Sequence, residues 1–326
     1  MSGRYLKKVD TGFGSTILGA CQLSVINAYQ GQTHLYPEYP FSSHFATIDG
    51  HRLHYLDEGV GRVIVMVHGN PTWSYYYRHL IVLLSKTHRV IAVDHLGCGL
   101  SDKPQDYPYR LQNHRDNLEA LLRQLQITSY SLIVHDWGGA IGLGVAGRNL
   151  QALEKLVILN TAAFRSQRIP WRIRVCRWPV IGSLLVRGLN GFAGPAVFMA
   201  VTRRLRPEVV RAYLAPYDSW HNRVAVYGFV RDIPLDPAHP SYATLQEVEE
   251  GLAGIAARNI PILICWGGRD FCFNDHFYQE WRRRFPKAES HYFKDAGHYV
   301  LEDALPEIRP LLADFFADSA SSGTVR

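Results

Sequence analysis

Three apolar runs of strand length constrain the fold of this chain more than any other feature. They read RVIVMV at 62–67, RVIAV at 89–93 and YSLIV at 130–134, and each ends in polar residues or glycine. A strand that is apolar at consecutive positions is buried on both faces, as in a parallel sheet that helices cover. Leucines recur at helical spacing through 109–126, between the second and third runs. This alternation predicts a doubly wound α/β sheet.

The same pattern divides the chain into an interrupted core and an insertion. With 326 residues, of which 47% are hydrophobic, the chain can form one globular domain with a large core. HFATIDGHRLHYLDEG at 44–59 predicts a hairpin around Asp49 and Gly50, and further strands are expected in EKLVILNT, PILICW and ESHYF. After the sixth strand, prolines separate aromatic and basic helix-like stretches. We therefore expect an N-terminal extension at 1–43, a core at 44–162 and 247–318, a helical cap at 163–246 and a frayed tail at 319–326.

The stretch VHDWGGA at 134–140 joins the third run to a glycine-rich helix start. In a nucleophile elbow, a strained strand-to-helix turn raises one side chain above the sheet, and small neighbours make room for it. Asp136 occupies that position, and a carboxylate is ionised at neutral pH, so it can attack an electrophilic carbon without a base. A helix-capping role would explain the aspartate but not the motifs below. The glycines of GGAIGLG lack the GxGxxG register, so we expect no nucleotide cofactor.

Asp270 and His298 complete a triad in the chain order nucleophile, acid, histidine that such elbows use. Asp270 follows IPILICWGG and His298 follows ESHYFKDAG, so both lie just past the carboxyl ends of expected strands. Open α/β sheets gather their active sites at that edge. An acid after the preceding strand would also serve, but that segment reads LNTAAF and has no carboxylate. We expect Asp270 to orient His298, and His298 to act as a general base.

The loop HGNPTW at 68–73 follows the run at 62–67 and predicts an oxyanion-binding loop. The backbone N–H groups of Asn70 and Trp137 are then expected to face an intermediate formed at Asp136. Their side chains add an amide and an indole N–H, which are both neutral donors. The pair predicts a slot for a departing anion, because an unpaired buried anion is very costly. Taken singly, Asn70 reads equally well as a turn residue and Trp137 as a packing aromatic.

Four motifs resemble the haloalkane dehalogenase family of α/β-hydrolases: HGNPTWS at 68–74, DHLGCGLSDKP at 94–104, HDWGGAIG at 135–142 and DAGHYVLED at 295–303. The likeness extends from about residue 44 to residue 318. It implies the α/β-hydrolase fold, with a mostly parallel sheet flanked by helices and an inserted helical cap. The triad of Asp136, Asp270 and His298 with the halide-binding pair Asn70 and Trp137 resembles subfamily III of that family.

This resemblance leaves two activities open. A dehalogenase would convert a haloalkane and water into a primary alcohol and halide, through an alkyl ester on Asp136 that water activated by His298 hydrolyses. Subfamily III also includes the β-lactone decarboxylases of bacterial long-chain olefin biosynthesis, which release carbon dioxide and a cis-alkene. RAYLAPYDSW at 211–220 and HPSYATL at 239–245 resemble the cap of those enzymes. We take the dehalogenase as the first hypothesis and the decarboxylase as the alternative.

Two further hypotheses are weaker. An epoxide hydrolase also uses an aspartate nucleophile, but it needs acidic donors from the cap, and Asn70 argues against it. The tyrosines that could supply such donors are Tyr213, Tyr217, Tyr227 and Tyr242. A catalytically dead interaction module would be expected to have lost members of the triad, and none is lost.

The cap carries an unusual excess of positive charge. Nine arginines occur from Arg165 to Arg206, and no acidic residue lies between Thr161 and Pro207. A solvated basic face would explain this segment, as would a surface for membranes or acidic partners. PWRIRVCRWPVIGSLLVRGL at 170–189 mixes tryptophans and leucines with these arginines, which fits a rim for long apolar chains or a contact surface for partner enzymes. We expect self-association and binding to anionic vesicles at low salt, and no motif indicates a nucleic-acid partner.

Cysteine usage favours a cytoplasmic location. The five cysteines are scattered and lack CxxC or histidine-rich spacing, so we expect neither disulfides nor a metal site. FGSTILGACQLSVINAYQG at 13–31 superficially resembles a signal peptide, but polar residues interrupt it. An amphipathic helix packed on the body is the simpler hypothesis for that segment, and peripheral membrane association remains open.

Overall fold

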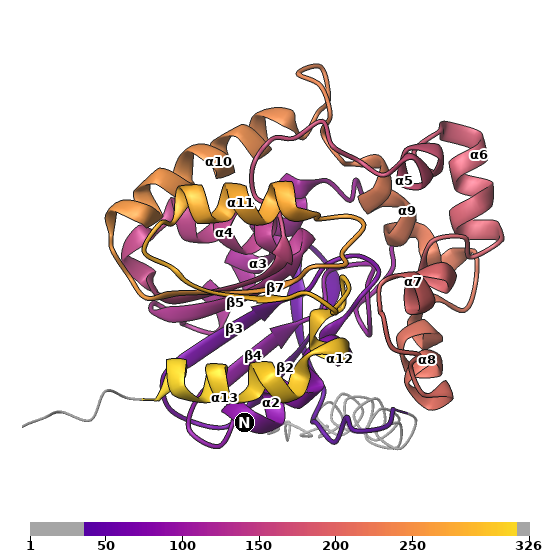
Figure 1. Cartoon of the computed structure of the whole chain (residues 1–326). Helices are drawn as coiled ribbons and strands as arrows, with labels where there is room; N and C mark the ends of the chain where they lie inside the picture. The colour runs from indigo at the N-terminus through magenta and orange to yellow at the C-terminus, as the bar shows by residue number, and fades with distance from the viewer. Residues whose placement is uncertain (1–35, 318–326) are drawn as a thin grey trace, which may run out of the picture.

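The computed structural model describes residues 36–317, and Figure 1 shows a central sheet between layers of helices. The sheet has eight strands in the order β1-β2-β4-β3-β5-β6-β7-β8. β1 pairs antiparallel with β2, and β2 with β4, whereas all other neighbours are parallel. The predicted mostly parallel α/β sheet is therefore confirmed. The strands are β1 (His44–Ile48), β2 (His51–Glu58), β3 (Val63–Val67), β4 (Arg89–Val93), β5 (Tyr130–Asp136), β6 (Leu153–Thr161), β7 (Ile262–Gly267) and β8 (Glu289–Phe293).

The hairpin predicted around Asp49 and Gly50 joins β1 to β2. Ile48 lies opposite His51 in the register, so the two residues between them form the whole turn. Asp49 has φ 49° and Gly50 has φ 80°. A two-residue turn with both central residues at positive φ matches the twist of the flanking strands, which is why Asp-Gly favours it.

The core lies on both faces of the parallel strands. In β3, Val65 and Val67 pack into one hydrophobic cluster, whereas Ile64 and Met66 pack into another on the opposite face. Because successive side chains of a strand point to opposite faces, an apolar run of this kind needs helices on both sides. One face is covered by α3 (Leu111–Gln124), α4 (Trp137–Arg148), α10 (Tyr242–Ala257) and α11 (Asp275–Arg284). The other is covered by α2 (Arg78–Leu84), α12 (Val300–Asp303) and α13 (Leu305–Phe316).

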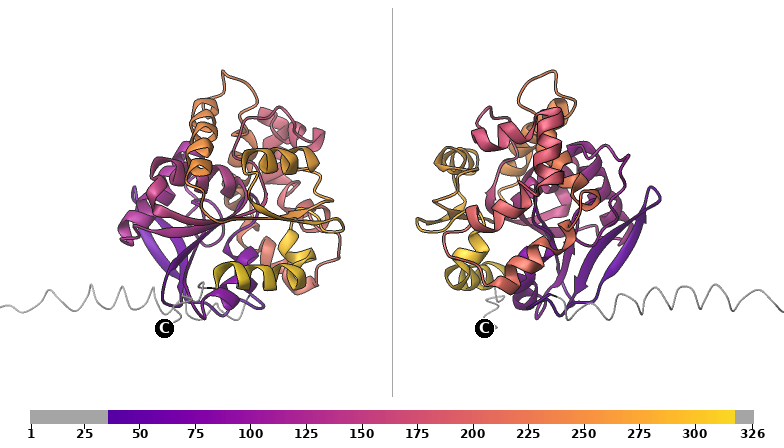
Figure 2. Two further views of the ribbon diagram at one scale, coloured as in Figure 1. Left: turned by 60° about the vertical axis from the view of Figure 1, so that its left-hand side comes forward. Right: turned by 90° about the vertical axis from the view of Figure 1, so that its right-hand side faces the viewer.

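The segment between β6 and β7 begins with short helices that form a cap on one side of the sheet (Figure 2). Pro179 and Pro207 each stand at the start of a helix, where a missing backbone N–H costs little. The cap helices are α5 (Trp171–Cys176), α6 (Pro179–Ser183), the π-helix η4 (Leu184–Gly188), α7 (Ala193–Met199), α8 (Pro207–Leu214) and α9 (Val224–Arg231).

Residue 246, where the sequence analysis places the end of the cap, lies within α10 (Tyr242–Ala257). α10 runs through that position without a break and packs against α4 of the core. Gly147 of α4 and Gly251 of α10 face each other at this contact, and the absence of side chains lets the two helices approach closely. α10 as a whole therefore covers the sheet.

Only the last part of the expected N-terminal extension at 1–43 belongs to the described residues. There, Tyr39 and Phe41 are buried, and the Tyr39 hydroxyl lies 2.6 Å from Ser74 Oγ. The helix expected at 13–31 and the tail at 319–326 lie outside the described residues. Among residues 36–317 no single helix is long and apolar enough to cross a bilayer. The two helical segments at 179–188 and 193–199 reach the required length and apolar composition only when they are taken together, and they are bent by 71° relative to each other.

Candidate active site

Asp136 stands at a strained turn between β5 and α4. Its backbone has φ 52° and ψ −125°, a conformation that side chains rarely adopt outside functional turns. Gly138 lies so close to β3 that a Cβ would collide with the carbonyl oxygen of Val67, and a Cβ on Gly139 would collide with the Thr161 hydroxyl. That hydroxyl donates a hydrogen bond to the carbonyl oxygen of Asp136. The turn thus requires the glycines that follow Asp136 in the sequence.

The two carboxylate oxygens of Asp136 have different surroundings. Oδ1 accepts a hydrogen bond of 2.6 Å from the backbone N–H of Asn70, whereas Oδ2 lies 3.6 Å from Nε2 of His298. Burial raises the pKa of Asp136, and the charge of His298 and the backbone N–H groups of Asn70 and Trp137 oppose that rise. With Oδ1 held by the loop after β3, Oδ2 is the oxygen left to react.

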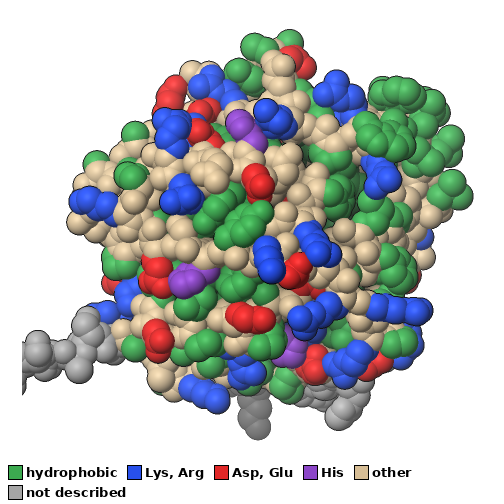
Figure 3. All heavy atoms as spheres, in the orientation of Figure 1, with side chains coloured by type: hydrophobic (Ala, Val, Ile, Leu, Met, Phe, Trp, Pro, Cys, Tyr) green, Lys and Arg blue, Asp and Glu red, His purple; other side chains and the backbone are tan. Residues whose placement is uncertain are grey.

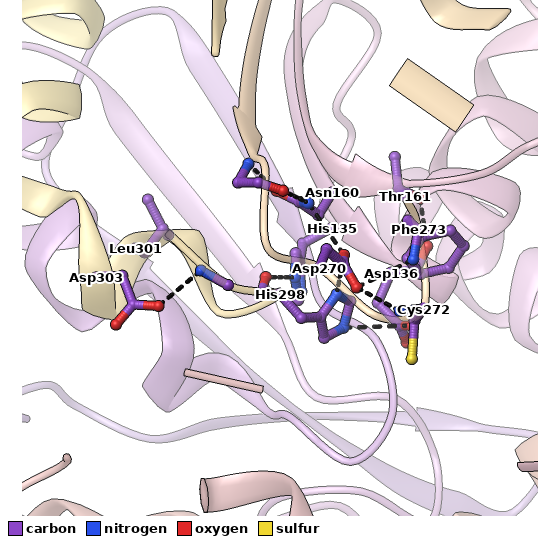
Figure 4. Close-up of polar contacts among 12 residues, drawn as sticks. His135, Asp136, Asn160, Thr161, Asp270, Cys272, Phe273, His298, Leu301 and Asp303 are labelled. Carbon is purple, nitrogen blue, oxygen red and sulfur yellow. Dashed lines mark hydrogen bonds and ion pairs between the residues drawn. The ribbon is translucent and has the colours of Figure 1, made fainter. Parts of the chain in front are cut away.

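His298 lies between two carboxylates, as Figure 4 shows. Its Nδ1 is 2.7 Å from Oδ2 of Asp270, and its Nε2 faces Asp136. Burial disfavours the charged imidazole, but Asp270 and then Asp136 outweigh burial, so the pKa of His298 is raised. Asp270 is fixed in turn, because its Oδ1 accepts backbone N–H bonds from Cys272 at 2.6 Å and Phe273 at 3.0 Å.

His298 differs in this respect from four other buried histidines nearby. Burial is the largest cause that lowers the pKa of His68, His95, His114 and His135, which favours their neutral forms. For His114 the pKa falls to about 3. These rings pack on one another or on aromatic rings, with no carboxylate in hydrogen-bond contact. A base near Asp136 is therefore best supplied by His298.

Asn160, at the end of β6, is a site residue that reasoning from the sequence missed. Its Nδ2 donates to Oδ2 of Asp270 at 3.0 Å and to the carbonyl oxygen of Gly267 at 3.0 Å. Its Oδ1 accepts the backbone N–H of Gly267 at 2.8 Å. The amide therefore clamps the end of β7, from which Asp270 projects. The signal was present in LNTAAF, where an amide side chain stands at the carboxyl end of an expected strand.

Asp303, at the end of α12, ties the loop that carries His298 to the cap. Its Oδ2 accepts the backbone N–H groups of Gly297 and Thr202 at 2.8 Å each, and its Oδ1 accepts that of Arg203 at 3.0 Å. Because Gly297 directly precedes His298, this buried carboxylate links the histidine loop to the segment between α7 and α8.

Asn70 and Trp137 reach the same cavity as Asp136, although Asn70 is also tied to the cap. The side-chain Nδ2 of Asn70 donates to the carbonyl oxygen of Val226 in α9 at 3.2 Å. An amide nitrogen has two hydrogens, so one N–H remains for a ligand. The Trp137 ring packs against Phe229 of the same cap helix, with centroids 5.3 Å apart. The cap therefore positions both donors that the sequence assigned to the core.

A cavity of about 420 Å³ begins at these residues and extends under the cap. Its inner end is lined by Asn70, Asp136, Trp137 and His298, and most of its wall is apolar. The apolar wall includes Phe164, Ile173, Phe192, Met199, Val230, Leu245, Phe273 and Phe277. Apolar walls with polar atoms only near one end suit a mainly hydrocarbon molecule with one reactive group.

The fold and this site have clear relatives. A family profile described as "alpha/beta hydrolase fold" matches residues 62–305. The chain belongs to the α/β-hydrolase family. A cis-3-alkyl-4-alkyloxetan-2-one decarboxylase of Shewanella oneidensis is 44% identical over 87% of this α/β-hydrolase and 91% of the relative. A haloalkane dehalogenase of Mycolicibacterium paratuberculosis is 31% identical over 83% of this chain and 91% of that protein.

Among solved structures, this α/β-hydrolase resembles the haloalkane dehalogenase DatA of Agrobacterium tumefaciens. The TM-score is 0.76 at 27% identity, over 84% of this chain and 95% of the neighbour. The resemblance to the haloalkane dehalogenase family expected from the four motifs is therefore confirmed, together with the branch that contains β-lactone decarboxylases.

The four tyrosines considered as epoxide donors are engaged elsewhere in this hydrolase. The hydroxyl of Tyr213 donates to Glu302, that of Tyr217 to the carbonyl of Thr72, and that of Tyr227 to the carbonyl of Pro179. The ring of Tyr242 lies against the guanidinium of Arg165. None of these tyrosines is among the residues that line the cavity at Asp136. Ring opening of an epoxide would therefore not find its acid donors among these four tyrosines.

Proposed function

We propose that this α/β-hydrolase is a β-lactone decarboxylase, which converts a cis-3-alkyl-4-alkyloxetan-2-one into a cis-alkene and carbon dioxide. The similarity to the Shewanella decarboxylase, 44% against 31% for the mycobacterial dehalogenase, carries this choice. The comparisons thus favour the alternative over the dehalogenase, which was the first hypothesis from the sequence. In this proposal Asp136 is the nucleophile, His298 is the imidazole that faces it, and Asp270 is the acid that orients His298.

In the first step, Oδ2 of Asp136 attacks the saturated ring carbon that carries the ring oxygen. The bond between that carbon and the ring oxygen breaks, which relieves the strain of the four-membered ring and leaves an ester on Asp136 and a free carboxylate. Oδ1 is already bound by the backbone N–H of Asn70 at 2.6 Å, which supports Oδ2 as the attacking atom. The indole N–H of Trp137 and the remaining amide N–H of Asn70 hold the new carboxylate.

In the second step, the electron pair of the bond to the carboxylate carbon forms the double bond and expels the Asp136 carboxylate. Carbon dioxide and the alkene leave, the nucleophile is regenerated, and no water is consumed. An apolar cavity favours this step, because a charged carboxylate is destabilised there relative to neutral carbon dioxide. The protonated imidazolium of His298 stabilises the departing carboxylate of Asp136. Asp270 raises the pKa of His298, and Nε2 of the ring lies 3.6 Å from Oδ2 of Asp136.

Haloalkane dehalogenation remains the second candidate. The observation that favours it is the Asn70–Trp137 pair on a fold that matches solved dehalogenases at a TM-score of 0.76. In that reaction Asp136 displaces halide, and His298 then removes a proton from the water that hydrolyses the ester.

Product identification separates the two reactions. The purified enzyme is incubated with a long-chain cis-β-lactone and, in parallel, with a panel of haloalkanes. We expect equimolar cis-alkene and carbon dioxide from the lactone, no hydroxy acid from hydrolysis of the ring, and little halide from the panel. Halide release without alkene formation would replace the proposed function with the dehalogenase.

The surroundings of the enzyme follow from the same proposal. A dialkyl lactone is barely soluble in water, so the enzyme works beside a membrane or beside the enzymes that make its substrate. The proposal also includes a cytoplasmic location and self-association. The arginine-rich cap supports this part of the proposal.

A further inference from the structure

Exposed apolar side chains gather on the outer helices of the cap. Trp171 is 70% exposed, Val180 71% and Leu189 77%. We call the surface formed by α5, α6, η4 and α7 the cap face, and Figure 3 shows hydrophobic side chains collected at the edge of the molecule where α5 and α6 lie in Figure 1. The exposed apolar residues of the cap face are Trp171, Trp178, Val180, Ile181, Leu184, Leu189, Phe198 and Met199. Apolar side chains concentrated on one face in this way mark an interaction surface.

Unpaired arginines accompany these side chains. Arg168, Arg172 and Arg174 are exposed, and none of them forms an ion pair with a carboxylate of residues 36–317. Arg165 and Arg206, near the two ends of the basic segment, do pair, with Glu249 and Glu38. The cap face therefore presents positive charge that the described part of the protein does not neutralise.

The cavity that begins at Asp136 opens through the same surface. Arg168, Trp171, Arg172 and Met199 line the cavity and are also exposed. An apolar molecule that leaves this mouth into water would lose the favourable burial of its hydrocarbon surface. This loss does not occur if hydrocarbon covers the apolar, basic cap face around the mouth of the cavity.

We propose that the cap face docks on an anionic lipid bilayer and takes apolar substrates directly from it. Tryptophans and aliphatic side chains enter the region between headgroups and acyl chains, and the arginines bind lipid phosphates while their stems stay in the apolar layer. A second copy of this chain fits less well, because a symmetric contact would bring two unpaired basic faces together. The bend of 71° between 179–188 and 193–199 suits helices that lie in the interface. The proposal holds for either reaction at Asp136.

The test compares binding of full-length proteins to vesicles of phosphatidylcholine with and without phosphatidylglycerol. One variant combines Val180→Ser, Ile181→Ser and Leu184→Ser, and a second carries Arg174→Glu; none of these residues lines the cavity. The matched controls are Val60→Ser, at a side chain 82% exposed in the loop after β2, and Arg123→Glu, at an exposed arginine of α3.

We expect wild type and both controls to bind the anionic vesicles. Both cap variants should lose at least about tenfold in vesicle affinity. Wild-type binding should weaken as salt rises, because salt screens the arginines. Turnover of a short, soluble substrate should be unchanged in every variant, which separates this test from that of the reaction. Absence of vesicle binding by wild type at low salt, or equal binding by cap variants and controls, would overturn the proposal. The proposal would also be overturned if wild type did not bind lipid and a cap variant lost self-association, because the cap face would then be a protein interface.

Discussion

Replacement of Asn160 by leucine tests how the acid of the site is held. Leucine keeps the branched shape of the asparagine side chain, with two bulkier methyl groups in place of the amide atoms, and three hydrogen bonds are lost: two to the backbone of Gly267 and one to Asp270. Asn160 has no exposed area and does not line the cavity, so the change leaves the walls around a substrate as they are. Any effect on catalysis must then act through Asp270 and His298.

The size of the effect follows from the groups that lose their partners. The C=O of Gly267 keeps a partner, because it also accepts the backbone N–H of Asp270 at 3.4 Å, whereas the buried N–H of Gly267 loses its acceptor. A buried polar group without a partner lowers the free energy of unfolding by about 1–3 kcal/mol, against a total of about 5–15 kcal/mol for a typical domain. Urea unfolding of wild type and Asn160→Leu measures this difference. A loss below about 0.5 kcal/mol, typical of a surface substitution, would refute the reasoning.

Asn160→Asp distinguishes positioning from stability alone. A protonated carboxyl at this position still donates to Asp270, whereas an ionised one places a second negative charge about 3 Å from Oδ2 of Asp270. Burial and the like charge raise the pKa of the new carboxyl, so activity should be retained at acidic pH and lost as pH rises through that pKa. A pH–rate profile identical to that of wild type would mean that Asn160 has no part in holding the acid.

Further predictions concern other groups of the site and the cap. Under the second candidate reaction, dehalogenation, His298→Phe should release about one halide per enzyme from a haloalkane and keep the alkyl group on Asp136, measured by mass spectrometry; steady turnover would mean that another base serves. Because the pKa of His298 is raised, any step that needs the neutral imidazole should fail as pH falls, with a midpoint above about 6.5 in the pH profile of kcat. Trp137→Phe should reduce kcat about a hundredfold with any substrate, and a loss below about threefold would contradict its role as a donor. Burial raises the pKa of Asp232 to about 6 from 3.8, so the folded state binds the proton more tightly; unfolding free energy should fall by about 2 kcal/mol as pH rises from 4 to 6, and Asp232→Asn should abolish this fall in urea titrations.

The sequence alone determined the features that depend on neighbouring residues. Consecutive apolar positions predicted strands buried on both faces, Asp-Gly predicted the turn at 49–50, and VHDWGGA predicted the strained turn at Asp136. The order of strands also indicated that Asp136, Asp270 and His298 would meet at one edge, because the carboxyl ends of parallel strands lie together. These inferences need only local conformational preferences and the rules of parallel sheets.

Tertiary structure alone decided which distant groups complete the site. Asn160 reaches Asp270 across 110 residues and Asn70 reaches Val226 across 156, and an amide has no local pattern that names such a partner. Tyr213, Tyr217 and Tyr227 were open as donors in the sequence, yet in the structure their hydroxyls are bonded to other groups. The place of α10 over the sheet depended on its packing against α4, and the cavity depended on how the cap lies over the sheet. Each of these features arises from contacts between elements that only the folded chain brings together.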